Sequence, residues 1–196
     1  MTYLNDVLFG VIEGITEFLP ISSTGHLLLA EHWLGSRSDT YTIVIQAGAI
    51  LAVTLIYWGR IVSLLTGWRD PASRDYLIKL TVAFLITGVL GFILAALGFE
   101  LPETIEPVAW ALVIGAFWMI AAEYYAEKQQ ESTDIPWRVA IGVGIAQIVA
   151  AIFPGTSRSG TTIFAAMLLG TSNRAAATEF AFLVGIPTMY AASAYE

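Results

Sequence analysis

The sequence predicts an all-α polytopic membrane protein with a single membrane domain over residues 1–196, and three observations support this class. Only 13% of the residues are charged and 57% are hydrophobic, whereas about a quarter of the residues of a typical soluble domain are charged. The mean hydropathy is +0.71. Several uncharged runs approach the ~20 residues that a helix needs to cross a bilayer, and the clearest are 40–58 and 80–99.

Composition also excludes several classes of function. The net charge of −7 argues against a nucleic-acid partner, because no basic stripe is available to neutralise phosphates. The absence of cysteine excludes disulfides, thiolate metal sites and cysteine nucleophiles. The first apolar segment is not a cleavable signal peptide, since it has no basic start and carries Asp6, Glu13 and Glu17.

Residues 3–33 combine helical periodicity with a high density of polar groups. Apolar residues recur three and four positions apart over 3–19, which predicts an amphipathic helix. Glu13 and Glu17 share its polar face. Pro20 ends this helix, and a second helix of about a dozen residues is expected to follow. The first piece is charged and the second is too short to span. The pattern therefore predicts a re-entrant hairpin whose polar tip is buried within the protein.

Three membrane spans are expected next, over 40–58, 77–99 and 105–125. The connection 59–79 carries four basic residues, whereas 99–106 carries three glutamates and no basic residue. Cytoplasmic loops are enriched in lysine and arginine. The first connection is therefore expected on the cytoplasmic side and the second outside.

A second polar stretch repeats the first at an offset of 134 residues. It predicts a second re-entrant hairpin over 137–170, broken at Pro154–Gly155, and one further span over 175–195. Five positions correspond at this offset, namely Gly10 with Gly144, Glu13 with Gln147, Pro20 with Pro154, Ser22 with Thr156, and Ser23 with Ser157.

These correspondences predict an inverted repeat with units of about 1–127 and 137–196. A re-entrant hairpin returns to its own side and three spans then cross the membrane, so the second hairpin enters from the opposite face. The two tips then meet near the midplane, as in transporters built from inverted repeats. The second unit has one span where the first has three, so we expect that the chain is truncated or that a partner completes its bundle. The polar side chains gathered in this site are Glu13, Glu17, Ser22, Ser23, Thr24, His26, Gln147, Thr156, Ser157, Arg158 and Ser159.

This set of residues suits phosphoryl transfer. Arg158 offers a planar fork for phosphate at the start of a half-helix, where unpaired N–H groups also bind anions. Glu13 and Glu17, one turn apart, can hold a divalent cation such as Mg²⁺ or Ca²⁺. His26 is a candidate general acid, general base or nucleophile. Gln46 lies in the middle of its span, where it either hydrogen-bonds the hairpin tip or helps helices to pack, and Gln147 is a supporting residue.

At these residues the sequence resembles a known family. "EGITEFLPISSTGH" at 13–26 and "PGTSRSGTT" at 154–162 are similar to the two signatures of the undecaprenyl-diphosphate phosphatase family, also called the bacitracin-resistance protein family. The similarity extends over the whole chain. It implies hydrolysis of undecaprenyl diphosphate to the monophosphate, which recycles the lipid carrier of cell-wall peptidoglycan synthesis. It also implies a divalent cation and a plasma-membrane location, with the site open to the external face.

The resemblance also assigns roles to individual residues. It makes Glu13, Glu17, His26 and Arg158 the essential set. We favour Ser23 as the nucleophile, assisted by His26, and attack by His26 itself or by metal-bound water stays open. The phosphate-binding residues are then Ser22, Ser23, Thr24, Thr156, Ser157, Arg158, Ser159 and Thr162.

Other interpretations remain at this point. The main alternative is a transporter or flippase for a phosphorylated lipid, in which the same midplane site binds the headgroup and a coupling ion. A non-catalytic membrane subunit is a weaker one. At the residue level, Glu13 and Glu17 could be solvated acids near the headgroups, His26 a structural histidine, and Arg158 an interfacial residue that snorkels. The sequence does not fix the oligomeric state, and a homodimer is one candidate.

Overall fold

The computed structural model describes residues 3–98 and 105–195, and within them every regular element is a helix. This confirms the all-α class. The helices are α1 (Tyr3–Thr16), α2 (Ser23–Leu34), α3 (Asp39–Ile56), α4 (Trp58–Thr66), α5 (Pro71–Ala96), α6 (Ile105–Ala126), α7 (Trp137–Ile152), α8 (Arg158–Leu168) and α9 (Arg174–Tyr195).

Three helices of the described chain, α5, α6 and α9, are long and apolar enough to cross a membrane. A fourth candidate is the pair α3–α4, which is bent by 60°. The protein is therefore a multi-pass membrane protein. Its apolar surface fits this assignment, because many large hydrophobic side chains, such as Phe92, Ile114 and Phe117, are exposed on these helices.

The prediction that residues 59–79 form a connection between two spans is wrong, because most of these residues are helical. Residues 58–66 form α4 and α5 already begins at Pro71, so only 67–70 link the two helices. Asp70 causes the early start, since its side chain accepts a hydrogen bond from the Ser73 backbone N–H at 2.9 Å. An aspartate at this position followed by proline is a strong helix-start signal. Residue 99, the expected end of the span, lies outside the described residues.

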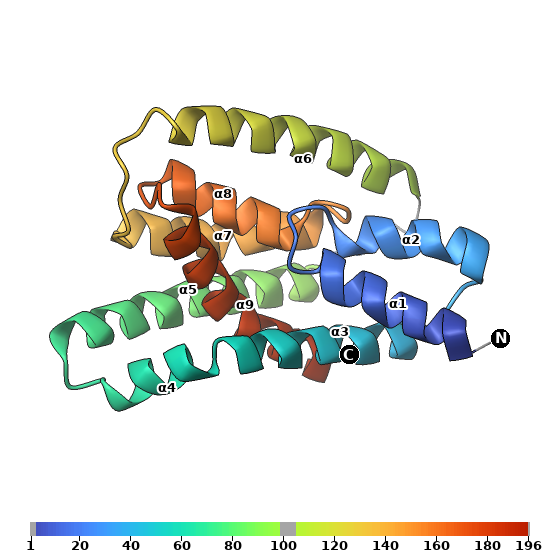
Figure 1. Cartoon of the computed structure of the whole chain (residues 1–196), viewed down its shortest axis with the longest axis horizontal. Helices are drawn as coiled ribbons and strands as arrows, with labels where there is room; N and C mark the ends of the chain where they lie inside the picture. The colour runs from blue at the N-terminus through green and yellow to red at the C-terminus, as the bar shows by residue number, and fades with distance from the viewer. Residues whose placement is uncertain (1–2, 99–104, 196) are drawn as a thin grey trace.

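Two broken hairpins, α1–α2 and α7–α8, enter the molecule from opposite ends, and their breaks lie side by side at its centre (Figure 1). The first helix of the first hairpin ends at Thr16, earlier than the expected Leu19, and a turn carries the chain past Pro20. The helix starts keep the spacing seen in the sequence. The first residues of α1 and α7 differ by 134 positions, and those of α2 and α8 by 135.

Serine caps start the second helix of each hairpin. The Ser22 side chain accepts from the Gly25 N–H at 3.3 Å, and the Ser157 side chain accepts from the Gly160 N–H at 3.2 Å. Such caps satisfy backbone donors that helix geometry leaves unpaired. The hairpin breaks are therefore built from the same local chemistry.

The second hairpin is held by close backbone contacts with two spans. At Gly144 a Cβ atom would lie 2.7 Å from the Ala83 carbonyl oxygen of α5. At Gly155, whose φ is +93°, a Cβ atom would lie 2.7 Å from the Val108 carbonyl oxygen of α6. Only glycine allows both the left-handed backbone and this approach. These contacts fix the position of the second break between α5 and α6.

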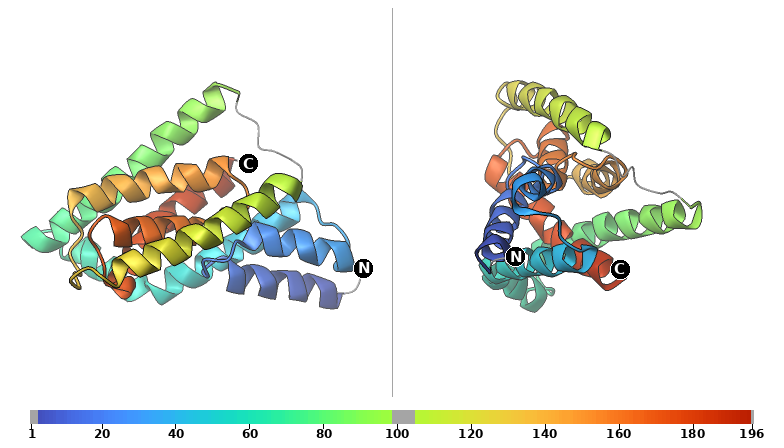
Figure 2. Two further views of the ribbon diagram at one scale, coloured as in Figure 1. Left: turned by 90° about the horizontal axis from the view of Figure 1, so that it is seen from above. Right: turned by 90° about the vertical axis from the view of Figure 1, so that its right-hand side faces the viewer.

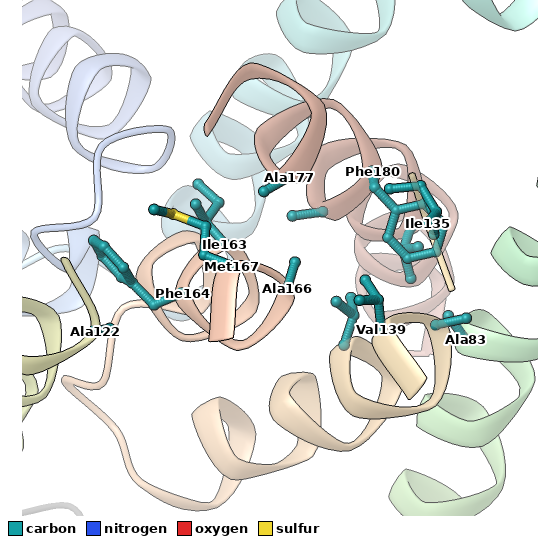
Figure 3. Close-up of a cluster of buried hydrophobic side chains, with 14 of the residues drawn as sticks. Ala83, Ala122, Ile135, Val139, Ile163, Phe164, Ala166, Met167, Ala177 and Phe180 are labelled. Carbon is teal, nitrogen blue, oxygen red and sulfur yellow. The ribbon is translucent and has the colours of Figure 1, made fainter. Parts of the chain in front are cut away.

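The main hydrophobic core surrounds the second hairpin (Figure 3). Figure 3 shows side chains of α8 and α9 meeting those of α7, with Ala83 of α5 at one edge and Ala122 of α6 at the other. Phe180 is the largest of its fully buried side chains. The second hairpin therefore rests in a packed core rather than in lipid.

The first hairpin is fixed at its open end by Arg37. Its guanidinium pairs with Asp6 at 3.0 Å, lies 4.6 Å from the centre of the Phe9 ring and has a side chain only 5% exposed. The Tyr41 hydroxyl of α3 donates to the Asp6 backbone oxygen at 2.7 Å. Buried charges need such partners to be tolerated. This cluster ties α1, α2 and α3 together far from the hairpin tip.

Candidate active site

The two hairpin breaks contact each other directly. The Ser159 hydroxyl donates to the Leu19 carbonyl oxygen at 2.9 Å, and the Ser157 hydroxyl reaches the same oxygen at 3.5 Å. A Cβ atom on Gly160 would lie 3.2 Å from Pro20 Cβ. The two tips are therefore in contact.

A polar cavity of about 80 Å³ lies between the tips, and we refer to it as the polar cavity. A smaller cavity of about 30 Å³, the inner cavity, adjoins it, and Glu17 and Arg158 line both. The polar cavity is lined by Glu17, Ser22, Ser23, Thr24, Gln46, Ala150, Pro154, Gly155, Thr156, Ser157 and Arg158. The inner cavity is lined by Glu17, Phe18, Val53, Gln147, Arg158, Ser159, Thr162, Ala181, Phe182, Gly185, Ile186 and Met189.

Glu17 is the hydrogen-bond partner of Ser23. The Ser23 hydroxyl donates to Glu17 Oε2 at 2.5 Å, across the break of the first hairpin. A short bond of this kind between a hydroxyl and a carboxylate is charge-assisted. Ser23 was expected to be assisted by His26, but the carboxylate of Glu17 is the base that lies against its hydroxyl.

Glu13 lies behind the cavity on α1, 1% exposed, with no hydrogen-bond partner for its Oε2 within the described residues. The charges of Glu17 and Arg158 both act on its carboxyl group. A buried carboxylate oxygen without a partner is costly. The Oε2 of Glu13 is therefore left without a hydrogen bond from any described residue.

His26 follows one turn after the break. Its Nδ1 lies 2.8 Å from the Ser22 carbonyl oxygen, and since a carbonyl only accepts, Nδ1 carries a proton and donates it. Nε2 is then the nitrogen available for chemistry. Ser22 itself has φ of 65°, the one non-glycine residue with positive φ among those described. Such strain concentrates at functional sites. His26 does not line either cavity.

Arg158 begins α8 and is half-buried. No described residue forms an ion pair or side-chain hydrogen bond with its guanidinium. It stands beside the free N–H groups of a helix start, which favour anions. Its hydrogen-bonding capacity is therefore left for a ligand.

A residue outside both motifs also shapes the site. Gln147 Nε2 donates to Thr87 Oγ1 at 3.0 Å, and the Thr87 hydroxyl lies 3.0 Å from the Ala83 and Gly144 carbonyl oxygens. Because Thr87 donates its one proton to a carbonyl, it can only accept from Gln147. This fixes the amide, and Gln147 Oε1 is left buried without a partner among the described residues. Its being one of two threonines, with Thr81, within the apolar run of α5 was the only signal for Thr87.

The predicted site residues thus come together with two exceptions. All of them except Glu13 and His26 line one of the two cavities, and Gln46 is among those that do. Ser159 and Thr162 use their hydroxyls on backbone oxygens, of Leu19 and Arg158 respectively. The sequence did not predict the apolar wall supplied by Val53 of α3 and by residues of α9.

The described residues contain no cluster of three or more His, Cys, Asp and Glu side chains that could hold a metal. Glu13 and Glu17 therefore form the whole carboxylate set here. Mg²⁺ is commonly held by one or two carboxylates, with water and substrate phosphates completing its coordination. The unpartnered oxygen of Glu13 fits that pattern.

The fold and the site define the class of the protein: a multi-pass helical membrane protein whose polar residues gather where two opposed, broken hairpins meet. The comparison with known families identifies it further. The family model "Bacitracin resistance protein BacA" matches residues 6–196, and the chain belongs to this family.

Relatives at high identity carry one name. The undecaprenyl-diphosphatase of Rhizobium johnstonii is 70% identical over 196 residues, which cover 100% of this chain and 74% of the relative. The undecaprenyl-diphosphatase of Xanthomonas euvesicatoria is 60% identical over 192 residues, covering 98% of this chain and 72% of the relative. The undecaprenyl-diphosphatase of Xylella fastidiosa is 60% identical over 189 residues, which cover 96% of this chain and 72% of the relative.

Proposed function

We propose that this protein is a membrane phosphatase that hydrolyses undecaprenyl diphosphate to the monophosphate and phosphate, recycling the lipid carrier of cell-wall synthesis. The observation that carries the proposal is that one cavity is lined both by a guanidinium without a hydrogen-bond partner among the described residues and by a hydroxyl hydrogen-bonded to a carboxylate. Arg158 lines the polar cavity without a partner, and Ser23 lines it with its hydroxyl on Glu17. Relatives 60–70% identical bear the name undecaprenyl-diphosphatase.

The proposed reaction begins with attack of Ser23 Oγ on the terminal phosphorus. Glu17 takes the hydroxyl proton, the new O–P bond forms, and the bond from phosphorus to the bridging oxygen breaks. The prenyl monophosphate leaves and water then releases phosphate from the serine. Arg158 and the N–H groups at the start of α8 hold the phosphate oxygens through the transition state, as electrostatic catalysis of phosphoryl transfer requires.

His26 is proposed as the second proton carrier. Its Nδ1–H is held on the Ser22 carbonyl, which leaves Nε2 to donate to the leaving oxygen or to accept from the attacking water. The competing route, direct attack by Nε2, makes a different intermediate. Acid quenching of a radiolabelled turnover distinguishes them, because phosphoserine survives acid and phosphohistidine does not.

We propose Glu13 and Glu17 as the protein ligands of a divalent cation, Mg²⁺ or Ca²⁺. The support is the carboxylate pair one turn apart on the first hairpin and the orphan Oε2 of Glu13. When bound, such a cation neutralises charge on the diphosphate.

The test is phosphate release from undecaprenyl diphosphate by the purified protein. Release that Arg158→Ala and Glu17→Gln both abolish supports the assignment, and release that survives both substitutions overturns it. Removal of divalent cations with a chelator, followed by their return one at a time, tests the proposed cation by loss and recovery of the same signal.

A transporter or flippase is the second candidate, favoured by one observation. Two broken hairpins that meet from opposite ends (Figure 1) are an arrangement found in secondary transporters. In vesicles a flippase would move a fluorescent prenyl phosphate between leaflets without releasing phosphate. Phosphate release without any such movement excludes it.

The location proposed for the protein is the plasma membrane, with the site reached from the external face. Seven of its nine lysine and arginine residues belong to α4, the first third of α5, the loops after α4 and α6, and the starts of α7 and α9, at the end where the second hairpin enters (Figure 1). These seven are Arg60, Arg69, Arg74, Lys79, Lys128, Arg138 and Arg174. Basic residues favour the cytoplasmic side, so the first hairpin enters from outside.

A further inference from the structure

Three cavities that share lining residues are arranged in a series from the polar cavity to the outer surface of the helix bundle. The first step is a pocket of about 40 Å³ between the first break and α6, which we refer to as the linking pocket. It shares Gly155, Thr156 and Ser157 with the polar cavity. The linking pocket and the polar cavity therefore lie on either side of the same three residues of the second break.

The path then opens into a much larger space of about 710 Å³ between α6 and α7, the membrane groove. The linking pocket and the membrane groove share Gly115, Trp118 and Thr161, among others, and Thr156 lines all three spaces. The volume lies within the range of small-molecule sites. The membrane groove is lined by Pro107, Trp110, Ala111, Ile114, Gly115, Trp118, Gly142, Ile145, Ala146, Val149, Phe153, Thr156, Thr161 and Ala165.

The chemistry of the lining changes along this path. Around the polar cavity it consists mainly of hydroxyl, carboxylate, amide and guanidinium groups. Along the membrane groove it is almost wholly apolar, and Trp110, Ile114 and Trp118 of α6 are exposed there. α6 rests on α8 and α2, so the groove beside α7 lies open on the side of the bundle. A polar head and an apolar tail would find matching surroundings in these neighbouring spaces.

We propose that the membrane groove binds the part of the prenyl chain next to the diphosphate while the diphosphate occupies the polar cavity. This rests on the proposed function. Lipid tails are as apolar as the groove, so moving the prenyl chain from the lipid into the groove gains little free energy from the hydrophobic effect. Its contribution is orientation: a chain held between α6 and α7 fixes the bridging oxygen relative to Ser23 and Arg158.

Gly115 offers a way to block the membrane groove without disturbing the fold. It lines both the linking pocket and the groove, and a Cβ atom built on it meets nothing within 4 Å. A leucine there occupies space that only a ligand would use. Gly88 of α5 is the matched control, because it is equally open and lines none of the three spaces.

The first experiment compares Gly115→Leu, Gly88→Leu and the unchanged protein on farnesyl diphosphate and dimethylallyl diphosphate. A filled groove lowers kcat/KM for the longer substrate by about tenfold or more, as one misplaced side chain does in a shaped pocket. The short substrate loses less than about twofold, and Gly88→Leu changes neither. An equal loss on both substrates, or no loss on farnesyl diphosphate, overturns the proposal.

The second experiment measures occupancy without catalysis. The chain has no cysteine, so Ile114→Cys places a single thiol in the groove. Farnesyl diphosphate slows its reaction with a maleimide, whereas inorganic diphosphate does not. Val89→Cys, on the exposed face of α5, is protected by neither compound.

The outcomes separate the two proposals. If no diphosphate is hydrolysed but farnesyl diphosphate still protects Ile114→Cys, the proposed function fails and the groove assignment stands. If hydrolysis proceeds but neither compound protects the thiol, or both protect it equally, the groove does not hold the chain. Disulfide-linked dimers through Ile114→Cys would make the groove an interface between copies and overturn its assignment to substrate.

Discussion

At the scale of single residues, the polar side chains of the site divide into those that donate to backbone oxygens of the hairpins and those left over for a ligand. Ser159 and Thr162 donate to backbone oxygens, so their hydroxyls are structural in this state. Arg158, the Oε2 of Glu13 and the Oε1 of Gln147 have no partners among the described residues. One guanidinium donor and two side-chain oxygen acceptors without partners among these residues lie in the same region. They indicate a bound group that both accepts and donates hydrogen bonds, as a diphosphate with a metal ion or proton does.

Arg158→Lys tests whether the planar guanidinium group of Arg158 binds the phosphate. The ammonium keeps the charge but loses the planar pair of donors, so we expect kcat/KM for phosphate release to fall by about 100-fold. Since no described residue pairs with the guanidinium, the melting temperature in detergent should stay the same. A melting temperature that falls together with activity would instead make Arg158 a structural residue.

Thr87→Val tests whether a residue outside the motifs positions Gln147. The valine removes the acceptor for Gln147 Nε2, which frees the amide to turn and costs about 1–3 kcal/mol for the unpaired group. We expect kcat to fall and Thr87→Ser to restore most of it. Thr81→Val, on the exposed face of the same helix, is the control, and an equal effect there would contradict the positioning role.

The sequence could predict which polar residues gather between the two hairpins but not how they pair. Glu13 and Glu17 are recognisable because they stand one turn apart within an apolar segment. The bond from Ser23 to Glu17 rather than to His26 depends on how the break folds back, and no spacing rule determines that. Thr87 is 60 residues from Gln147, so its role requires the packing of α5 on α7.

At the scale of elements, prolines and glycines determine where the helices break. Pro20 and Pro154 fall at the two breaks, as the sequence indicated. The 60° bend between α3 and α4 was not expected, because the run 40–58 contains no charged residue and no proline. Leu64 of α4 packs with Val53, Leu183 and Ile186 in a separate cluster, so contacts with α9, which lie far along the chain, accompany the bend.

Gly155→Ala tests the fit of the second break against α6. The residue has φ of +93°, and its Cβ would lie 2.7 Å from the Val108 carbonyl oxygen, so both strain and overlap oppose a side chain. We expect a loss of about 2 kcal/mol or more in the free energy of unfolding, measured by denaturant titration in detergent. Gly88→Ala, with open space around it, should leave stability equal or raise it by about 1 kcal/mol.

At the scale of the whole molecule, the proposed orientation rests on the opposed hairpins and on the distribution of charge. The left view of Figure 2 agrees with Figure 1 that α1 and α7 run toward the centre from opposite ends. The loops after α6 and after α8 lie together at one end, since the Ser132 N–H donates to the Ser172 hydroxyl at 2.9 Å. That end carries most of the basic residues, which the positive-inside rule assigns to the cytoplasm.

Single-cysteine labelling tests this arrangement, because the chain has no cysteine of its own. Ser36→Cys lies between α2 and α3 and Thr133→Cys between α6 and α7, both at exposed positions. We expect a membrane-impermeant maleimide to label Ser36→Cys in intact spheroplasts and Thr133→Cys only after lysis. Labelling of both before lysis would contradict the opposed hairpins, since their open ends would then share one side. The reverse pattern would keep the fold and invert its orientation, and the site would then be supplied with substrate from the cytoplasmic side.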